Sequence, residues 1–270
     1  MTSRAFRRKG LVVLSSVMIG MVWPVGGAQA APECDGRQAT IVGTNNNDTI
    51  QGTNGNDVIV AKDGNDTVNG KDGNDRICGG DGNDELNCQG GGDTLVAGGD
   101  GHDDVTGGDG EDDVSGGNGD DAVNGGGDSD IVSGGDGLDD VFGEDGSDDL
   151  AGGDNSDLLV GGAGNDEVTG GAGGDDIFGG SGGDLLKGGD GDDVFDGDEG
   201  GDTLQGGADD DHLYAIDDNS GNDSLNGGPE NTEDTCSADS GDSLSNCETT
   251  PTAFDALYRK ALARFARATR

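Results

Sequence analysis

Residues 79–87 read Gly79-Gly80-Asp81-Gly82-Asn83-Asp84-Glu85-Leu86-Asn87, and this pattern recurs through most of the chain. The same order of residue types, Gly-Gly-x-Gly-x-Asp-x-apolar-x, describes residues 52–60 and 161–169, with some substitution at the first glycines. A fixed short period indicates a solenoid, in which each unit stacks on its neighbours. We number the positions of each unit 1 to 9 from its first glycine.

Aspartate occupies position 6 throughout, with one extra residue near Ala97 and a three-residue insertion near residues 215–217. About 20 units result, and position 8 is apolar in each of them. A periodic apolar residue excludes a random acidic tract and a simple glycine-rich linker. The position-6 aspartates are Asp48, Asp57, Asp66, Asp75, Asp84, Asp93, Asp103, Asp112, Asp121, Asp130, Asp139, Asp148, Asp157, Asp166, Asp175, Asp184, Asp193, Asp202, Asp211 and Asp223.

Positions 7 to 9 of each unit form a predicted strand of about three residues. Strand side chains alternate between faces, so only the apolar position-8 side chain points inward. The glycine-rich hexapeptide is then a turn, because glycine adopts positive φ and allows close backbone approach. We therefore expect an all-β fold, a parallel β-roll of about 20 nine-residue repeats with two repeats per coil. Its core consists of two facing ladders of Val, Ile and Leu.

The 270 residues include 57 Asp and Glu against 14 Lys and Arg, which gives a formal net charge of -43. Only 29% of the chain is hydrophobic, a combination that predicts disorder unless a bound counter-charge is present. The acidity argues against a nucleic-acid partner, because phosphates would be repelled. Stacked turns would bring aspartate beside aspartate, and a divalent cation between turns removes that repulsion. Calcium suits such turns, since it accepts six to eight carboxylate and carbonyl oxygens in flexible geometry.

These positions resemble the hemolysin-type (RTX) calcium-binding nonapeptide repeat over roughly residues 43–228. The resemblance implies a parallel β-roll in which position-6 aspartates and backbone carbonyls of turns stacked on one edge hold several Ca²⁺ ions. Asp57 would share an ion with the turn of Asp75, and Asp66 with the turn of Asp84. The implied metal ligands are Asp57, Asp66, Asp75, Asp84, Asp93, Asp103, Asp112, Asp121, Asp130, Asp139, Asp148, Asp157, Asp166, Asp175, Asp184, Asp193, Asp202 and Asp211.

Some turns depart from the family pattern. The first turn, residues 44–48, lacks its glycines, and Asp128, Asn155 and Asp209 replace the glycine at position 4. We expect these sites to be weaker or distorted. Asn155 is the mildest change, because asparagine tolerates the left-handed conformation better than most residues.

The first thirty residues show the pattern of a secretory signal peptide. Basic residues between Arg4 and Lys9 precede an apolar run at residues 11–23, and Ala28-Gln29-Ala30 supplies a small-x-small cleavage motif. We predict cleavage near Ala30 and a secreted, extracellular protein. The alternative is an uncleaved membrane anchor, but the apolar run is short for a membrane span.

Export permits disulfides among the five cysteines. Cys236 and Cys247 flank a short polar loop, and a bridge between them would close a C-terminal cap at residues 229–250. Cys34, in an N-terminal cap segment at residues 31–42, has two candidate partners, Cys78 and Cys88. We favour Cys78, which leaves Cys88 free or in an intermolecular bond.

Residues 251–270 contain five basic residues and one acid. Apolar residues at helical spacing predict a short basic amphipathic helix. We favour a cap over the open end of the roll, or docking on its acidic surface, above membrane, envelope or partner contact. The apolar residues of this helix are Phe254, Leu257, Tyr258, Ala261, Leu262 and Phe265.

The segments that flank the repeats are too short for a catalytic domain. The two histidines, His102 and His212, belong to no nucleophile–base motif and are interpreted as solvated turn residues. We expect a secreted calcium-binding protein that folds on binding Ca²⁺ after export and is not an enzyme. The alternative is a calcium-stiffened structural or adhesive protein of the cell envelope. Ice binding is disfavoured, because position 3 is mostly Asp, Gly or Ala rather than Thr or Asn.

Overall fold

The computed structural model describes residues 32–215, 222–229, 234–238 and 242–247. These residues belong to one compact unit, residues 31–270. The predicted signal peptide and the predicted C-terminal helix lie outside the described residues and stay predictions. Every regular element within the described ranges is a β-strand. The described part of the chain accordingly contains no helix of the length and apolarity that a membrane crossing requires.

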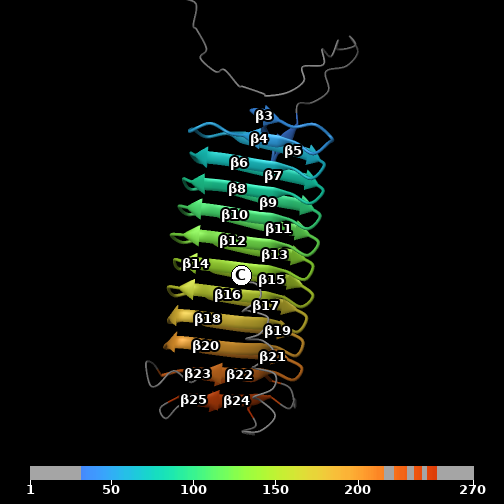
Figure 1. Ribbon diagram of the computed structural model, residues 1–270. Helices are drawn as coiled ribbons and strands as arrows, with labels where there is room; N and C mark the ends of the chain where they lie inside the picture. Colours follow the sequence, from blue (N-terminus) through green and yellow to red (C-terminus); the bar gives the residue numbers. More distant parts are fainter. Residues whose placement is uncertain (1–31, 216–221, 230–233, 239–241, 248–270) are drawn as a thin grey trace, which may run out of the picture. The chain divides into compact units, whose positions relative to one another are not determined.

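The strands form a parallel β-roll of about eleven coils, because successive strands alternate between a 12-stranded and an 11-stranded sheet (Figure 1). The 12-stranded sheet contains, in spatial order, β25 (Ser243–Ser245), β23 (Ser224–Asn226), β21 (Thr203–Ala208), β19 (Leu185–Asp190), β17 (Glu167–Ala172), β15 (Asp149–Asp154), β13 (Ile131–Asp136), β11 (Asp113–Asn118), β9 (Leu95–Asp100), β7 (Arg76–Asp81), β5 (Val58–Asp63) and β3 (Ile41–Val42). The 11-stranded sheet contains β24 (Thr235–Ala238), β22 (His212–Ala215), β20 (Val194–Gly200), β18 (Asp176–Gly182), β16 (Leu158–Ala163), β14 (Asp140–Asp145), β12 (Ala122–Gly127), β10 (Asp104–Asp109), β8 (Glu85–Gly90), β6 (Thr67–Asp72) and β4 (Thr49–Gln51).

The pairing register confirms two repeats per coil. Ile59 pairs with Ile77 in the larger sheet, and Val105 pairs with Val123 in the smaller one. Equivalent positions of alternate repeats therefore lie side by side, and every position of the nine-residue unit forms a row along the roll. A separate antiparallel pair, β1 (Glu33–Cys34) and β2 (Arg37–Gln38), precedes the roll.

The strands are longer than the expected three residues. Strand β8, for example, contains six residues and covers positions 7 to 9 of one unit and 1 to 3 of the next. Its burial alternates so that Leu86 at position 8 and Cys88 at position 1 both point inward. The glycines at positions 1 and 2 are thus part of the strand, because the neighbouring coils pair with them. Only positions 4 to 6 form the turn.

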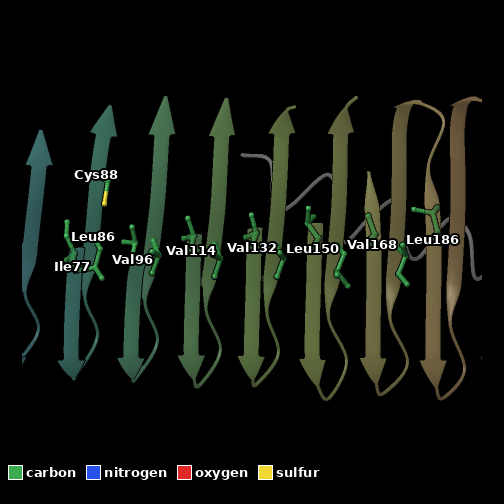
Figure 2. Packing of buried hydrophobic residues seen from close by; sticks show 14 of the residues in the cluster. Ile77, Leu86, Cys88, Val96, Val114, Val132, Leu150, Val168 and Leu186 are labelled. Atoms are coloured by element: carbon green, nitrogen blue, oxygen red, sulfur yellow. The ribbon is translucent and has the colours of Figure 1, made fainter. Parts of the chain in front are cut away.

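The core consists of the two facing ladders that the sequence predicts, and Figure 2 shows part of them, including Val114, Val132 and Leu150. The buried position-8 side chains are Ile50, Ile59, Val68, Ile77, Leu86, Val105, Val114, Val123, Val132, Val141, Leu150, Leu159, Val168, Ile177, Leu186, Phe195, Leu204, Leu213 and Leu225.

One position of this ladder was predicted wrongly. Val96 fills the core place that the sequence assigns to Leu95, and Val96 pairs with Ile77 while Leu95 pairs with Arg76. The N–H of Thr94 still donates to the carbonyl of Asp75. Two residues therefore stand opposite one, which is a β-bulge, and the extra residue lies directly after the aspartate rather than near Ala97.

At the C-terminal end, the roll continues beyond residue 228. Cys236 in β24 pairs with Leu213, and Leu244 in β25 pairs with Leu225. The segment expected to be a disulfide-closed cap thus contributes two further half-coils, whose sequences have lost the glycine pattern. The bridge within it, Cys236–Cys247, is present as predicted.

The second predicted bridge is also present and joins Cys34 in β1 to Cys78 in β7. Cys88 is the free cysteine among the described residues, and it is buried. Burial of the thiol among the aspartates raises its pKa far above the usual range. The N-terminal strand pair is therefore fixed covalently to the first coils of the roll.

Candidate calcium-binding turns

The position-6 aspartates form one row along each edge of the roll. Each aspartate except Asp93 directly precedes a strand. The row that begins at Asp57 therefore runs along the 12-stranded sheet, and the row that begins at Asp48 runs along the 11-stranded sheet. The aspartates from Asp57 to Asp211 are all buried, including every predicted ligand. The sequence therefore predicts correctly which carboxylates the fold gathers into rows.

One oxygen of each carboxylate links neighbouring coils. The backbone N–H of Asp57 donates to Oδ1 of Asp75 at 2.8 Å, and that of Asp103 donates to Oδ1 of Asp121 at 2.8 Å. The same hydrogen bond is present at the bulge, where the N–H of Asp93 donates to Oδ1 of Asp112 at 2.7 Å. These bonds bring together the turn pairs that the family pattern implies. Sequence reasoning missed this role of the aspartate, because the bond becomes apparent only after the coils are stacked.

In thirteen of these aspartates the second oxygen, Oδ2, is buried and accepts no hydrogen bond within the part of the chain that the structure describes. A buried carboxylate oxygen without a donor is costly, so each of these atoms requires either a proton or a cation. The aspartates concerned include Asp66, Asp75, Asp84, Asp103, Asp112, Asp121, Asp130, Asp139, Asp148, Asp166, Asp184, Asp193 and Asp211.

At many of these turns the position-1 glycine lies near both this oxygen and a backbone carbonyl of the next coil. An ideal Cβ built on Gly107, at position 1, would lie 2.5 Å from Oδ2 of Asp112 and 2.6 Å from the carbonyl oxygen of Gly125. At Gly161 the distances to the equivalent oxygens are both 2.6 Å. At these two turns glycine is favoured because the carboxylate occupies the space of a side chain, whereas Ala61 and Cys88 occupy position 1 in two other units.

The donor set fits a hard cation. Carboxylate and carbonyl oxygens both lie near position 1 at turns such as those of Asp112 and Asp166, and these are the ligands that calcium prefers. The described residues include no cluster of three or more His, Cys, Asp or Glu side chains that could hold a metal ion. A bound ion would therefore take most of its ligands from backbone carbonyls, with the aspartates supplying the charge.

Burial makes the charged form of these carboxylates unfavourable. It raises the pKa of Asp75 to about 6, that of Asp121 to about 7 and that of Asp193 to about 8. The hydrogen bond from the preceding coil opposes this rise, and repulsion from neighbouring aspartates adds to it. At neutral pH the rows thus need counter-charge to remain ionised inside the roll.

The first turn on each edge differs from the others. Oδ2 of Asp57 accepts hydrogen bonds from the N–H of Thr53 at 2.7 Å and from its hydroxyl at 2.8 Å. Thr44 donates to Oδ2 of Asp48 in the same way, at 2.6 and 2.8 Å. Asp57, a predicted ligand, thus has a satisfied carboxylate. The signal in the sequence was threonine in place of glycine at position 2.

Two lysines bring positive charge to the same terminal turns. The ammonium group of Lys62 donates to the carbonyl of Gly43 at 2.8 Å, and that of Lys71 donates to the carbonyl of Gly52 at 2.6 Å. Each lysine comes from position 2 of the next turn along its edge. The first turn on each edge therefore has a lysine ammonium group bound to its position-1 carbonyl, in addition to the threonine that donates to its carboxylate.

The turns with substituted position 4 keep a positive φ there, but with a smaller value. The φ angles of Asp128, Asn155 and Asp209 are 75°, 81° and 79°, whereas those of position-4 glycines such as Gly119 and Gly137 are 123° and 159°. The expected weakening of these three sites stays a prediction.

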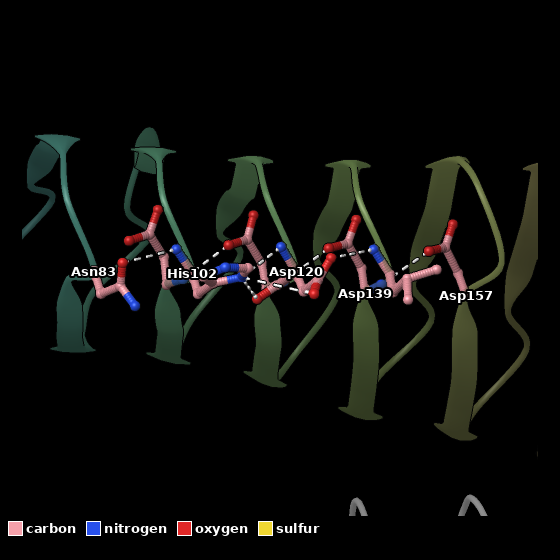
Figure 3. Close-up of polar contacts among 8 residues, drawn as sticks. Asn83, His102, Asp120, Asp139 and Asp157 are labelled. Carbon is pink, nitrogen blue, oxygen red and sulfur yellow. Dashed lines mark hydrogen bonds and ion pairs between the residues drawn. The ribbon is translucent and has the colours of Figure 1, made fainter.

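The two histidines occupy different places. His102 is an exposed turn residue, as predicted, and its Nδ1 accepts a hydrogen bond from the N–H of Asp120 at 2.9 Å (Figure 3). The interpretation of His212 as a solvated turn residue was wrong. This residue lies in β22, is half-buried, and its Nδ1 lies 2.5 Å from the Thr235 hydroxyl.

The structure defines the class of protein, a parallel β-roll whose glycine-rich turns hold buried rows of aspartate. Comparison with known families then identifies the family: the model of the RTX calcium-binding nonapeptide repeat matches most of the chain, and the chain belongs to this family. The matches cover residues 42–77, 51–86, 61–95, 89–123, 115–150, 124–159, 151–186 and 187–215.

Among solved structures, the chain is similar to a hyperactive, Ca²⁺-dependent, β-helical antifreeze protein from an Antarctic bacterium. The two chains are 17% identical, with a TM-score of 0.41, and the similarity covers 80% of this chain and 89% of the other. No curated protein sequence matches the chain.

Proposed function

We propose that this protein is a secreted calcium-binding β-roll that folds on binding Ca²⁺ after export and has no catalytic role. Its membership of a calcium-binding repeat family supports the calcium part of this proposal. The observation that carries it is the row of buried Oδ2 atoms without hydrogen-bond donors along both edges. A chain this acidic gains little from burial until these charges are neutralised.

We assign the ions to the turns from Asp66 to Asp211. Their carboxylates would supply Oδ2, and position-1 carbonyls of the next coil would supply further ligands, as the Gly125 carbonyl near Gly107 would at the turn of Asp112. Bound calcium would supply the positive charge that the rows require. We assign no ion to the turns of Asp48 and Asp57. Threonine already donates to their carboxylates, and lysine already donates to their position-1 carbonyls.

The test uses the chain from residue 31 onward, purified without calcium. Far-ultraviolet circular dichroism should change from coil to β-structure as calcium is added, and a chelator should reverse the change. Magnesium is the matched control and should be much less effective, because it prefers a smaller octahedral shell and retains its waters. Calorimetry over the same titration gives the number of ions. Equal β-structure with and without calcium, or coil in both, would contradict the proposal.

A further inference from the structure

The outer face of the 11-stranded sheet carries an apolar cluster separate from the core. Its members are Phe142 of β14, Leu158 and Val160 of β16, Phe178 of β18 and Val194 of β20. They occupy positions 7 and 9, whose side chains point away from the interior. Val160 pairs with both Phe142 and Phe178, so the three form a continuous row across neighbouring strands.

The burial of this cluster is inconsistent with an open face. Leu158 is 0% exposed, Phe178 4% and Val194 9%. Ile131 occupies the same position 7 on the outer face of the other sheet and is 57% exposed. An outward side chain at position 7 is therefore normally solvated, and the face around Leu158 is covered.

A buried carboxylate lies beside the cluster. Asp196 pairs with Phe178 across β18 and β20, points outward from position 9, and is buried. The N–H of Asp198 donates to Oδ1 of Asp196 at 3.2 Å, and a positive group nearby would further offset the lost hydration of this carboxylate. A covering segment that fits this face is thus apolar along one side and basic along its margins.

We propose that residues 251–270 of the same chain cover this face. Their sequence has the required character, since six apolar residues from Phe254 to Phe265 follow helical spacing between five basic residues. The roll has a large excess of acid, so the charges are complementary.

The length of the segment is sufficient for this position. The segment follows Cys247, which is bonded to Cys236 in β24, the last strand of the same sheet. The strands of the cluster, β14 to β20, lie two to five places from β24 in that sheet. At about 4.8 Å per strand, this range is roughly 10 to 24 Å, and a helix of 20 residues spans about 30 Å.

This assignment gives the basic tail a role inside the molecule. The tail buries the outward apolar cluster and places positive charge on an acidic sheet. Because its apolar side then contacts the sheet, the tail does not act as a membrane anchor. The inference depends on the fold and goes beyond the proposed calcium function.

A single tryptophan can report the contact, because Trp23 is the one tryptophan of the chain and lies in the predicted signal peptide. Tyr258→Trp in the chain from residue 31 onward then gives a unique fluorophore in the tail. In saturating calcium we expect blue-shifted emission and several-fold weaker quenching by acrylamide than in the unfolded chain. Solvent-exposed emission from the calcium-folded protein would overturn the proposal.

Leu158→Ser and Ile131→Ser form a matched pair, since both remove an outward aliphatic side chain at position 7, Leu158 in the 11-stranded sheet and Ile131 in the 12-stranded sheet. In the Tyr258→Trp background, Leu158→Ser should shift the emission of the introduced tryptophan to the red and raise acrylamide quenching several-fold, whereas Ile131→Ser should change neither. Circular dichroism of both variants in calcium checks that the roll remains folded, and a second variant, Val160→Ser, replaces Leu158→Ser if it does not. Equal responses of the two variants would refute the proposed contact.

Two further readouts test the other occupants. Emission that depends on protein concentration, together with dimers in sedimentation, would assign the face to a second copy. A blue shift that appears only with vesicles of anionic lipid would assign the tail to a membrane. Either result overturns the proposal. Failure of calcium-induced folding itself would appear in the circular dichroism and would count against the proposed function instead.

Discussion

At the residue scale, the position-6 aspartate has a separate role for each of its oxygens. Oδ1 of Asp121 accepts the N–H of Asp103 and joins two coils, whereas its Oδ2 is buried without a donor. The first role stabilises the stack in any ionic condition, and the second creates a demand for a cation. One residue type therefore both builds the roll and makes the roll dependent on counter-charge.

Asp121→Asn keeps an oxygen acceptor but removes the charge. In calcium we expect a loss of stability on the order of 1–3 kcal/mol and weaker ion binding at this turn. Without calcium we expect the opposite sign, because repulsion from Asp103 and Asp139 is removed. Chemical unfolding with and without calcium measures both effects. Asp81→Asn, at an exposed position 3, is the control, and equal effects of the two variants would refute the assignment.

Thr53→Val removes the hydroxyl that satisfies Asp57 at the N-terminal end. The free energy of unfolding should fall by about 1 kcal/mol, because a carboxylate oxygen loses a donor. The number of bound calcium ions should not change, since this turn is assigned no ion. Thr67→Val, at an exposed outward position of β6, is the matched control. Loss of one ion on the Thr53 substitution would show that the turn of Asp57 does bind calcium.

At the scale of the strand and turn, glycine is favoured for different physical reasons at different positions of the repeat. At position 1 the carboxylate of the same unit occupies the Cβ space, as Asp112 does at Gly107. At position 4 the requirement is a positive φ, which Asp128 and Asn155 also meet. The pattern therefore records both packing and backbone conformation, and only the second can be inferred from turn chemistry alone.

Gly107→Ala places a methyl group against the Asp112 carboxylate and the Gly125 carbonyl. We expect a loss of about 1–3 kcal/mol in stability, typical of overpacking, and weaker calcium binding at that turn. Gly127→Ala, two units later at position 3, meets nothing within 4 Å and should be neutral or slightly stabilising. Thermal unfolding of the two variants in calcium makes the comparison. A neutral Gly107→Ala would mean that the carboxylate does not occupy this space.

At the scale of the whole molecule, charge accumulates across coils and sets the conditions under which the roll is stable. Burial raises aspartate pKa values from 3.8 to about 6 at Asp84, about 7 at Asp130 and about 8 at Asp193. The metal-free roll therefore holds protons more tightly than the unfolded chain does. Protons and cations compete for the same rows.

Without calcium, stability should be fully present below about pH 4, the ordinary aspartate range, and should be lost as pH rises through about 6 to about 8. The β-signal in circular dichroism should thus be larger at pH 5 than at pH 8 in calcium-free buffer. With calcium, the dependence reverses, because acid displaces the ions. Measurements from pH 5 upward avoid the pI of about 4.1. A calcium-free signal that increases with pH would contradict this prediction.

The amino-acid sequence by itself determined the period, the two facing core ladders, the rows of aspartate and the Cys236–Cys247 disulfide. These follow from local rules, because strand alternation makes Leu86 point inward and a constant period brings Asp75 beside Asp57 in every such stack. Only the tertiary structure decided the six-residue strands, the choice of Cys78 rather than Cys88 as the partner of Cys34, the bulge that replaces Leu95 with Val96, the two extra half-coils at β24 and β25, and the covered face around Leu158. Each of these depends on which backbone or side chain lies across from a residue in another coil, and that neighbour is distant in sequence.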